Sequence, residues 1–176
     1  YTLIIFATYK RGHDEVEIIN CHACAPMLSL ATFKKDNNND WTLLSFKKTF
    51  EYHGSWGEIG AIDLVQIGKN KYALALAGGG LAQGYMMSFI SYYDIDTYNN
   101  VFEITTSEDN GGAEEDVTKT YGYEVDVEFV PSKEEYYQIE TTTRGTILSA
   151  DRQVIKADTQ QIFSYDKRKK KYIKKQ

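Results

Sequence analysis

The stretch NCHACAP (20–26) contains both cysteines of the chain, Cys21 and Cys24, with His22 between them. Thiol and imidazole side chains at this spacing could bind a metal ion, work as a redox pair, or form a local disulfide. A structural zinc site needs about four such ligands, and no second pair in the sequence has zinc-finger spacing. A c-type haem needs a histidine after the second cysteine, where this chain has Ala25.

A redox pair of the thioredoxin type lies at the start of a helix in an α/β chain, because the helix dipole lowers the pKa of the thiol. The sequence around Cys21 and Cys24 has no α/β pattern. We therefore expect a disulfide that fixes a turn, with free thiols or a metal site as the alternatives. A bridge over so short a loop gains little chain entropy, and a disulfide implies an oxidising compartment.

The stretch SEDNGGAEED (107–116) places carboxylates around two glycines. Hard oxygen ligands on a glycine-containing loop can bind Ca²⁺, although the spacing of an EF-hand is absent. The structural alternative is a solvated acidic loop. If the loop binds calcium, the candidate ligands are Asp109, Asn110, Glu114 and Asp116.

No set of catalytic residues can be identified from the sequence. The glycines of AGGGLAQG (77–84) are not followed by the Lys and Ser/Thr of a phosphate-binding loop, and no G-x-S-x-G nucleophile motif occurs. A few polar and aromatic residues near predicted turns could form a ligand-binding surface instead. These candidates are His22, His53, Trp56, Gln83 and Tyr85.

Charge is distributed unevenly along the chain. The formal net charge is −5, which makes a nucleic-acid partner unfavourable. The segment Lys167–Lys175 (KRKKKYIKK) holds seven cations and no acid, so the rest of the chain carries about −12. Lysine on an edge strand prevents unwanted pairing with strands of other molecules, and this role accounts for such a segment. Contact of the segment with an anionic surface is the alternative.

The hydrophobic pattern has a period of two residues almost throughout. The clearest example is YGYEVDVEFVP (121–131), where Tyr123, Val125 and Phe129 fall on one face and acidic residues on the other. Turn signals separate such runs: DNNND lies between MLSLATFKK and WTLLSFKKTF, and KN lies between IDLVQIG and YALALAG. The last residues, QIFSYDKRKKKYI, predict a closing hairpin.

These patterns predict one all-β domain over residues 1–176, with little helix. The expected architecture is an antiparallel meander of hairpins closed into a sandwich or a barrel. No apolar run approaches the ~18 residues that a membrane-spanning helix requires. The first residue is Tyr1, which fits removal of a secretion signal and fits a cloning boundary equally well.

Several short motifs occur in a fixed order. They are CHACAP at Cys21–Pro26, Trp41, GSWG at Gly54–Gly57, QG at Gln83–Gly84 and DNGG at Asp109–Gly112. In this order the motifs resemble a group of uncharacterised secreted proteins of bacteria. The resemblance implies a periplasmic or extracellular location and gives no activity to transfer.

Three classes of function remain. The first is a secreted or periplasmic binding module that recognises or inhibits a protein partner, since tyrosine, with 14 copies, suits recognition surfaces. The second is a small enzyme, either a thiol-redox protein that uses Cys21 and Cys24 or a hydrolase whose carboxylates are not assigned. A structural component of the cell envelope is a third alternative. The sequence indicates no particular ligand, and calcium is the only cofactor that it suggests.

Overall fold

The computed structural model describes residues 2–8, 21 and 24–175 of the chain. The described residues form strands joined by turns, with no helix, so no helix that could cross a membrane occurs among them. The all-β prediction is therefore confirmed. The strands are β1 (Thr2–Thr8), β2 (Met27–Lys35), β3 (Trp41–Tyr52), β4 (Ala61–Gly68), β5 (Lys71–Ala82), β6 (Tyr85–Asp94), β7 (Asn100–Asp109), β8 (Gly122–Val130), β9 (Gln138–Leu148), β10 (Val154–Asp166) and β11 (Lys171–Lys174).

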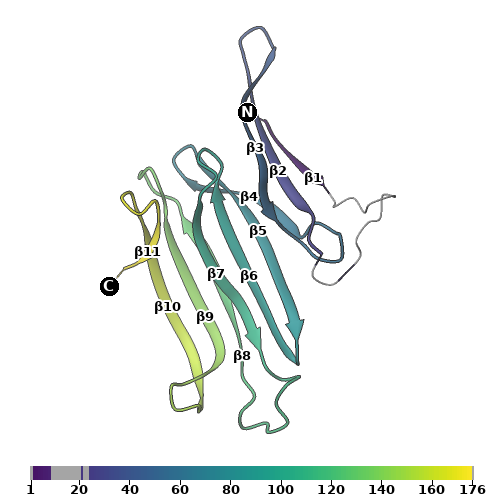
Figure 1. The fold of residues 1–176 in the computed structure, drawn as a ribbon. Helices are drawn as coiled ribbons and strands as arrows, with labels where there is room; N and C mark the ends of the chain where they lie inside the picture. The colour runs from purple at the N-terminus through teal and green to yellow at the C-terminus, as the bar shows by residue number, and fades with distance from the viewer. Residues whose placement is uncertain (1, 9–20, 22–23, 176) are drawn as a thin grey trace. The chain divides into compact units, whose positions relative to one another are not determined.

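The chain divides into two compact units, Tyr1–Ala61 (unit 1) and Ile62–Gln176 (unit 2). The expectation of a single domain stays a prediction. Unit 1 contains a three-stranded antiparallel sheet in the order β1-β2-β3 (Figure 1). The predicted hairpin between β2 and β3 is present, and the carboxylate of Asp36 accepts bonds from the backbone N–H groups of Asn38 and Asp40 in its turn. The alternation in EVEIIN (15–20) also predicts a strand, but this run lies outside the described residues.

Unit 2 contains an antiparallel meander in the order β11-β10-β9-β8-β7-β6-β5-β4, so each strand lies beside its neighbour in the sequence (Figure 1). The sheet has two edge strands, β4 and β11, and it is not closed into a barrel. The barrel alternative is therefore wrong, and the sandwich stays a prediction. Because the strands alternate in direction, the β5–β6 turn, the β7–β8 loop and the β9–β10 turn lie at one end of the sheet.

The sheet of unit 2 bends where β7 meets β8. These two strands pair over three positions only, from Ser107↔Glu124 to Asp109↔Gly122. The residues of β7 that precede Ser107 no longer pair with β8. Their side chains pack against those of β8–β11. Phe102 of β7, for example, has its ring centroid 5.0 Å from that of Phe163 and 5.9 Å from that of Tyr172.

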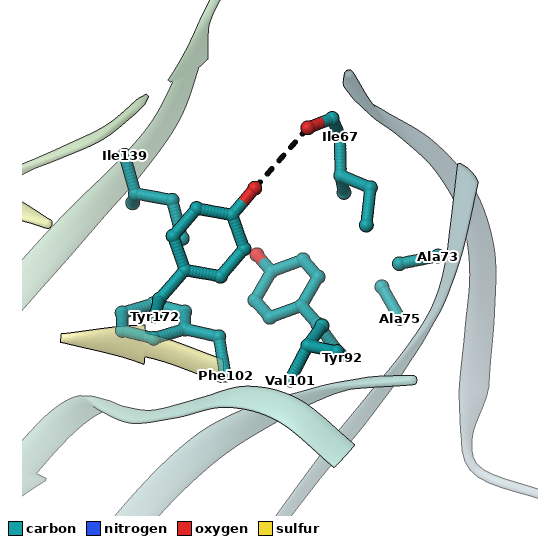
Figure 2. Packing of buried hydrophobic residues seen from close by; sticks show 8 residues of the cluster. All are labelled: Ile67, Ala73, Ala75, Tyr92, Val101, Phe102, Ile139 and Tyr172. Carbon is teal, nitrogen blue, oxygen red and sulfur yellow. Dashed lines mark hydrogen bonds between the residues drawn. The ribbon is translucent and has the colours of Figure 1, made fainter. Parts of the chain in front are cut away.

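The hydrophobic core of unit 2 fills this bend (Figure 2). Tyr172 of β11 and Ile67 of β4 meet across it, because the Tyr172 hydroxyl donates to the Ile67 carbonyl at 3.1 Å. The backbone N–H of Tyr137 donates to the same carbonyl at 2.8 Å. The buried members of the core are Ile67, Ala73, Ala75, Tyr92, Val101, Phe102, Ile139 and Tyr172.

Candidate functional site

The β5–β6 hairpin ends in a tight turn that presents apolar side chains to solvent. Strands β5 and β6 pair from Ala73↔Asp94 to Ala82↔Tyr85, which leaves a two-residue turn at Gln83 and Gly84. Both turn residues have positive φ, 52° and 81°, as in the hairpin turns that match the twist of a sheet. Around this turn, four large side chains are between 44% and 63% exposed, and we call them the apolar tip: Leu81, Tyr85, Met86 and Met87.

The β5–β6 turn rests directly on the β7–β8 loop. A Cβ atom added to Gly84 would lie 2.2 Å from the carbonyl carbon of Gly112, so only glycine allows this approach. The loop is itself held by Asn110, which is 3% exposed. The Asn110 side chain accepts from the backbone N–H of Tyr121 at 2.7 Å and donates to the carbonyl of Lys119 at 3.1 Å. The apolar tip is therefore fixed against a loop with its own internal bonds.

Two tyrosines hold the carboxylate of Glu108 at the same end of the sheet. The Tyr121 hydroxyl donates to Oε1 at 2.5 Å, and the Tyr123 hydroxyl donates to Oε2 at 3.1 Å. The bond to Glu108 and burial raise the pKa of Tyr121 to about 12. Burial, with the bond to Glu108, also raises the pKa of Tyr123. Both phenols therefore remain neutral hydrogen-bond donors well above neutral pH.

We expect Tyr121 to ionise near pH 12 rather than at the ordinary value of 10.0. Because the folded state favours the protonated phenol, this contribution to stability is complete below about pH 10 and disappears as the pH rises to 12. The measurement is a difference titration of phenolate absorbance between the wild type and Tyr121→Phe. In Glu108→Gln the pKa of Tyr121 should fall toward 10, and an unchanged pKa would show that the carboxylate has no such effect.

A cleft of about 510 Å³ lies beside the apolar tip. Cross-strand pairing brings Ser107, Glu124 and Arg144 into one row, since Ser107 faces Glu124 and Glu124 faces Arg144. In the wall of the cleft, Gly122 leaves room for the carboxylate of Asp109, because a Cβ at position 122 would lie 2.7 Å from its Oδ2. The cleft is lined by Met86, Ser107, Glu108, Asp109, Gly122, Tyr123, Glu124, Arg144 and Gly145.

The charges of the cleft are mostly negative. Glu108, Asp109 and Glu124 contribute carboxylates, and Arg144 contributes a guanidinium that forms an ion pair with Asp126. Exposed ion pairs of this kind add little to stability, so Arg144 can exchange Asp126 for another partner at low cost. The arrangement can therefore bind an apolar side chain at the tip and polar or charged groups in the cleft.

The cysteine prediction is confirmed, since Cys21 and Cys24 form a disulfide. The GSWG stretch, which the sequence did not connect with the cysteines, binds this loop through its backbone. The N–H of Trp56 donates to the carbonyl of Cys21 at 3.1 Å, and the N–H of Gly57 donates to the carbonyl of Cys24 at 2.7 Å. The disulfide therefore shapes a turn onto which a second turn docks.

The predicted ligand surface divides between the two units. His53 of unit 1 is 6% exposed, and its Nε2 donates to the carbonyl of Ala61 at 3.0 Å, which indicates a structural role. Trp56, also in unit 1, is 52% exposed. Gln83 and Tyr85 belong to the hairpin of unit 2 described above. His22 lies outside the described residues.

The predicted calcium ligands form hydrogen bonds with groups of the β7–β8 loop. The Asp109 carboxylate accepts from the N–H of Gly111, that of Glu114 from the N–H of Asp116, and that of Asp116 from Thr118. Asp109 belongs to the end of β7 rather than to the loop. Within the described residues, no group of three His, Cys, Asp or Glu side chains is placed to hold a metal ion. Calcium binding stays a prediction.

The cations of Lys167–Lys175 lie on the β10–β11 hairpin, as the sequence predicted. Lys167 pairs with Glu135 at 2.7 Å, and backbone N–H groups of Arg168 and Lys169 donate to Asp166 and lower the pKa of its carboxyl. This turn lies at the end of the sheet opposite the β5–β6 turn. Contact with an anionic surface stays a prediction.

Comparison with known proteins adds no relative. No protein-family model matches the chain, and no curated protein or solved structure matches it either.

Proposed function

We propose that this protein is a binding module that recognises a protein partner through the apolar tip and the adjoining cleft of unit 2. The observation that carries the proposal is the exposure of Leu81, Tyr85, Met86 and Met87 together on one hairpin end, beside a cleft of about 510 Å³. By the pairing register, Leu81 and Met86 lie on one face of this hairpin end and Tyr85 and Met87 on the other. Exposed apolar side chains rimmed by polar residues are typical of protein-binding surfaces.

The composition of this surface supports a protein partner. Tyrosine, methionine and arginine are enriched in interfaces, and all three occur here as Tyr85, Met86 and Arg144. The surface is also preorganised, because Gly84 lies against Gly112 and Asn110 holds the loop behind it. A rigid surface loses less conformational entropy on binding, so more of the contact energy appears as affinity.

We place the module in an oxidising compartment, the periplasm or the extracellular space. The disulfide between Cys21 and Cys24 supports this location, because such bonds are rare where thiols are kept reduced. The resemblance to secreted bacterial proteins points the same way. The thiol-redox alternative also uses Cys21 and Cys24, and rapid reversible exchange with a mild reductant would favour it over a structural disulfide.

Selection from a library of random peptides tests the proposed function. We expect peptides enriched on the immobilised protein to bind Tyr85→Ala and Met86→Ala about tenfold or more weakly than the wild type, because central aromatic and methionine side chains dominate interface energies. Both residues are half-exposed in the wild type, so the fold should tolerate these changes.

The matched control is Ile155→Ala on β10, since Ile155 is 44% exposed and lies outside the tip. Binding of the selected peptides by this variant should equal that of the wild type. Peptides that bind the tip variants and the wild type equally, or a library from which no binding peptide is enriched, would refute a recognition surface at the tip.

A further inference from the structure

The inner face of β8, β9 and β10 changes from apolar to polar along the strands. One cross-strand row of this face holds Phe129, Ile139 and Phe163, which belong to the core or pack against it. In the next row Val127 faces Thr141, and Thr141 faces Gln161. In the third, Val125 faces Thr143. The core therefore ends in a layer of hydroxyl and amide groups rather than in further aliphatic packing.

A cavity of about 270 Å³ lies over these polar rows, where β7 has left β8. Its apolar wall comes from Phe102 and Phe163, whose rings meet edge to face with centroids 5.0 Å apart. Its polar wall comes from Thr141, Thr143 and Gln161. The cavity is separate from the cleft beside the apolar tip, although Tyr123 lines both.

The hydroxyl of Thr141 has no hydrogen-bond partner among the residues that the structure describes, although Thr141 is only 2% exposed. The side chains of Thr143 and Gln161 likewise form no hydrogen bond within that part of the chain. Thr143 and Gln161 are only partly buried, and among the described residues the fully buried side-chain atom without a partner is Oγ of Ser164, so all three polar side chains can reach water in the cavity. The three side chains therefore leave hydrogen-bonding groups available in the cavity for a polar ligand.

The lining specifies a neutral occupant. Only Glu103 carries a charge among the described lining residues, and its carboxylate already accepts bonds from Ser91 at 2.7 Å and Asn100 at 3.5 Å. Threonine hydroxyls and a glutamine amide both donate and accept hydrogen bonds, so the ligand needs groups that do the same. The aromatic wall needs an apolar ligand face.

We propose that this cavity binds a single neutral sugar ring. A sugar ring combines hydroxyl groups, which would pair with Thr141, Thr143 and Gln161, with a C–H face that would lie against Phe102 and Phe163. The volume of about 270 Å³ is slightly below the range of drug-sized pockets, which limits the ligand to one ring. The ring can be a free monosaccharide or the terminal unit of a glycan.

The test titrates the full chain with neutral monosaccharides (glucose, galactose, mannose and N-acetylglucosamine), followed by backbone amide shifts in NMR. We expect at least one to shift the amides of β9 and β10. Thr141→Val removes the hydroxyl at nearly constant volume and should weaken this sugar about tenfold, since one buried hydrogen bond is lost. A glycan array then separates a free sugar from a terminal unit as the source.

The matched control is Thr142→Val, which makes the same change one residue away on the opposite face of β9. Its affinity should equal that of the wild type. Thr141→Val should unfold at the same or a higher temperature than the wild type, so weaker binding cannot come from a damaged fold. No binding by any of the four sugars, binding of simple amides instead, or equal binding by Thr141→Val would overturn the proposal. None of these outcomes bears on peptide binding at the tip.

Discussion

Replacing Tyr172 by alanine should lower the free energy of unfolding by about 3–5 kcal/mol, the usual cost of truncating a buried aromatic side chain. Tyr172 is 6% exposed, and its ring centroid lies 5.9 Å from those of Phe102 and Phe129 and 5.4 Å from that of Tyr165. It belongs to β11, an edge strand of four residues. Denaturant unfolding followed by circular dichroism measures the change.

Tyr172→Phe is the control, because it keeps the ring and removes only the hydroxyl. The Ile67 carbonyl would lose one hydrogen bond but would keep the N–H of Tyr137, so we expect a loss of only about 1 kcal/mol. If the alanine variant lost no more stability than the phenylalanine variant, the ring contacts would not contribute as described. If both lost several kcal/mol, the hydroxyl would matter more than the packing.

The strands of this fold were predictable because their signals are local. An Asp/Asn cluster between two apolar runs marked the β2–β3 hairpin, and the alternation of Tyr123, Val125 and Phe129 marked β8 with its inward face. Such signals depend on backbone preferences and on which face is buried, so a single strand reveals them. The open sheet was not predictable, because barrel closure depends on how the first and last strands meet.

The contacts of the site were not predictable because they depend on register. Glu108 meets Tyr121 and Tyr123 only because β7 and β8 pair across the loop between them with Glu108 opposite Tyr123. A shift of one residue would turn Glu108 to the other face. Tyr121 and Tyr123 were recognised as strand residues. The signal for their contact with Glu108 would have been tyrosines placed opposite a carboxylate on a neighbouring strand.

The sequence alone does not distinguish polar residues that line a site from polar residues that only face solvent. Thr141 and Thr143 in ETTTRG are indistinguishable in sequence from threonines on a solvated face, and only the pairing with Val127 and Val125 places them inside. The acidic loop shows the converse. Its carboxylates suggested calcium ligands, yet in the structure they accept backbone bonds of the loop, the common local role of Asp and Glu in turns.

Gly84→Ala should destabilise the protein and weaken partner binding together. Alanine would be held at a φ of 81°, and its Cβ would lie 2.2 Å from the carbonyl carbon of Gly112, in backbone that has no flexible end to move. Strain and overpacking of this kind cost roughly 3 kcal/mol. For a chain of this length that lowers the melting temperature by about 6–12 °C. Thermal unfolding measures the shift.

Gly80→Ala is the matched control, because it makes the same chemical change in the same hairpin, where no atom lies within 4 Å of the new Cβ. In a strand, alanine loses less conformational entropy on folding than glycine, so this variant should be as stable as the wild type or slightly more stable. The two variants separate close backbone contact from the loss of a glycine. If Gly80→Ala lowered the melting temperature as much as Gly84→Ala, the contact between Gly84 and Gly112 would not be what fixes the tip. If Gly84→Ala were stable but lost the selected peptides, the contact would orient the recognition surface without contributing to the fold.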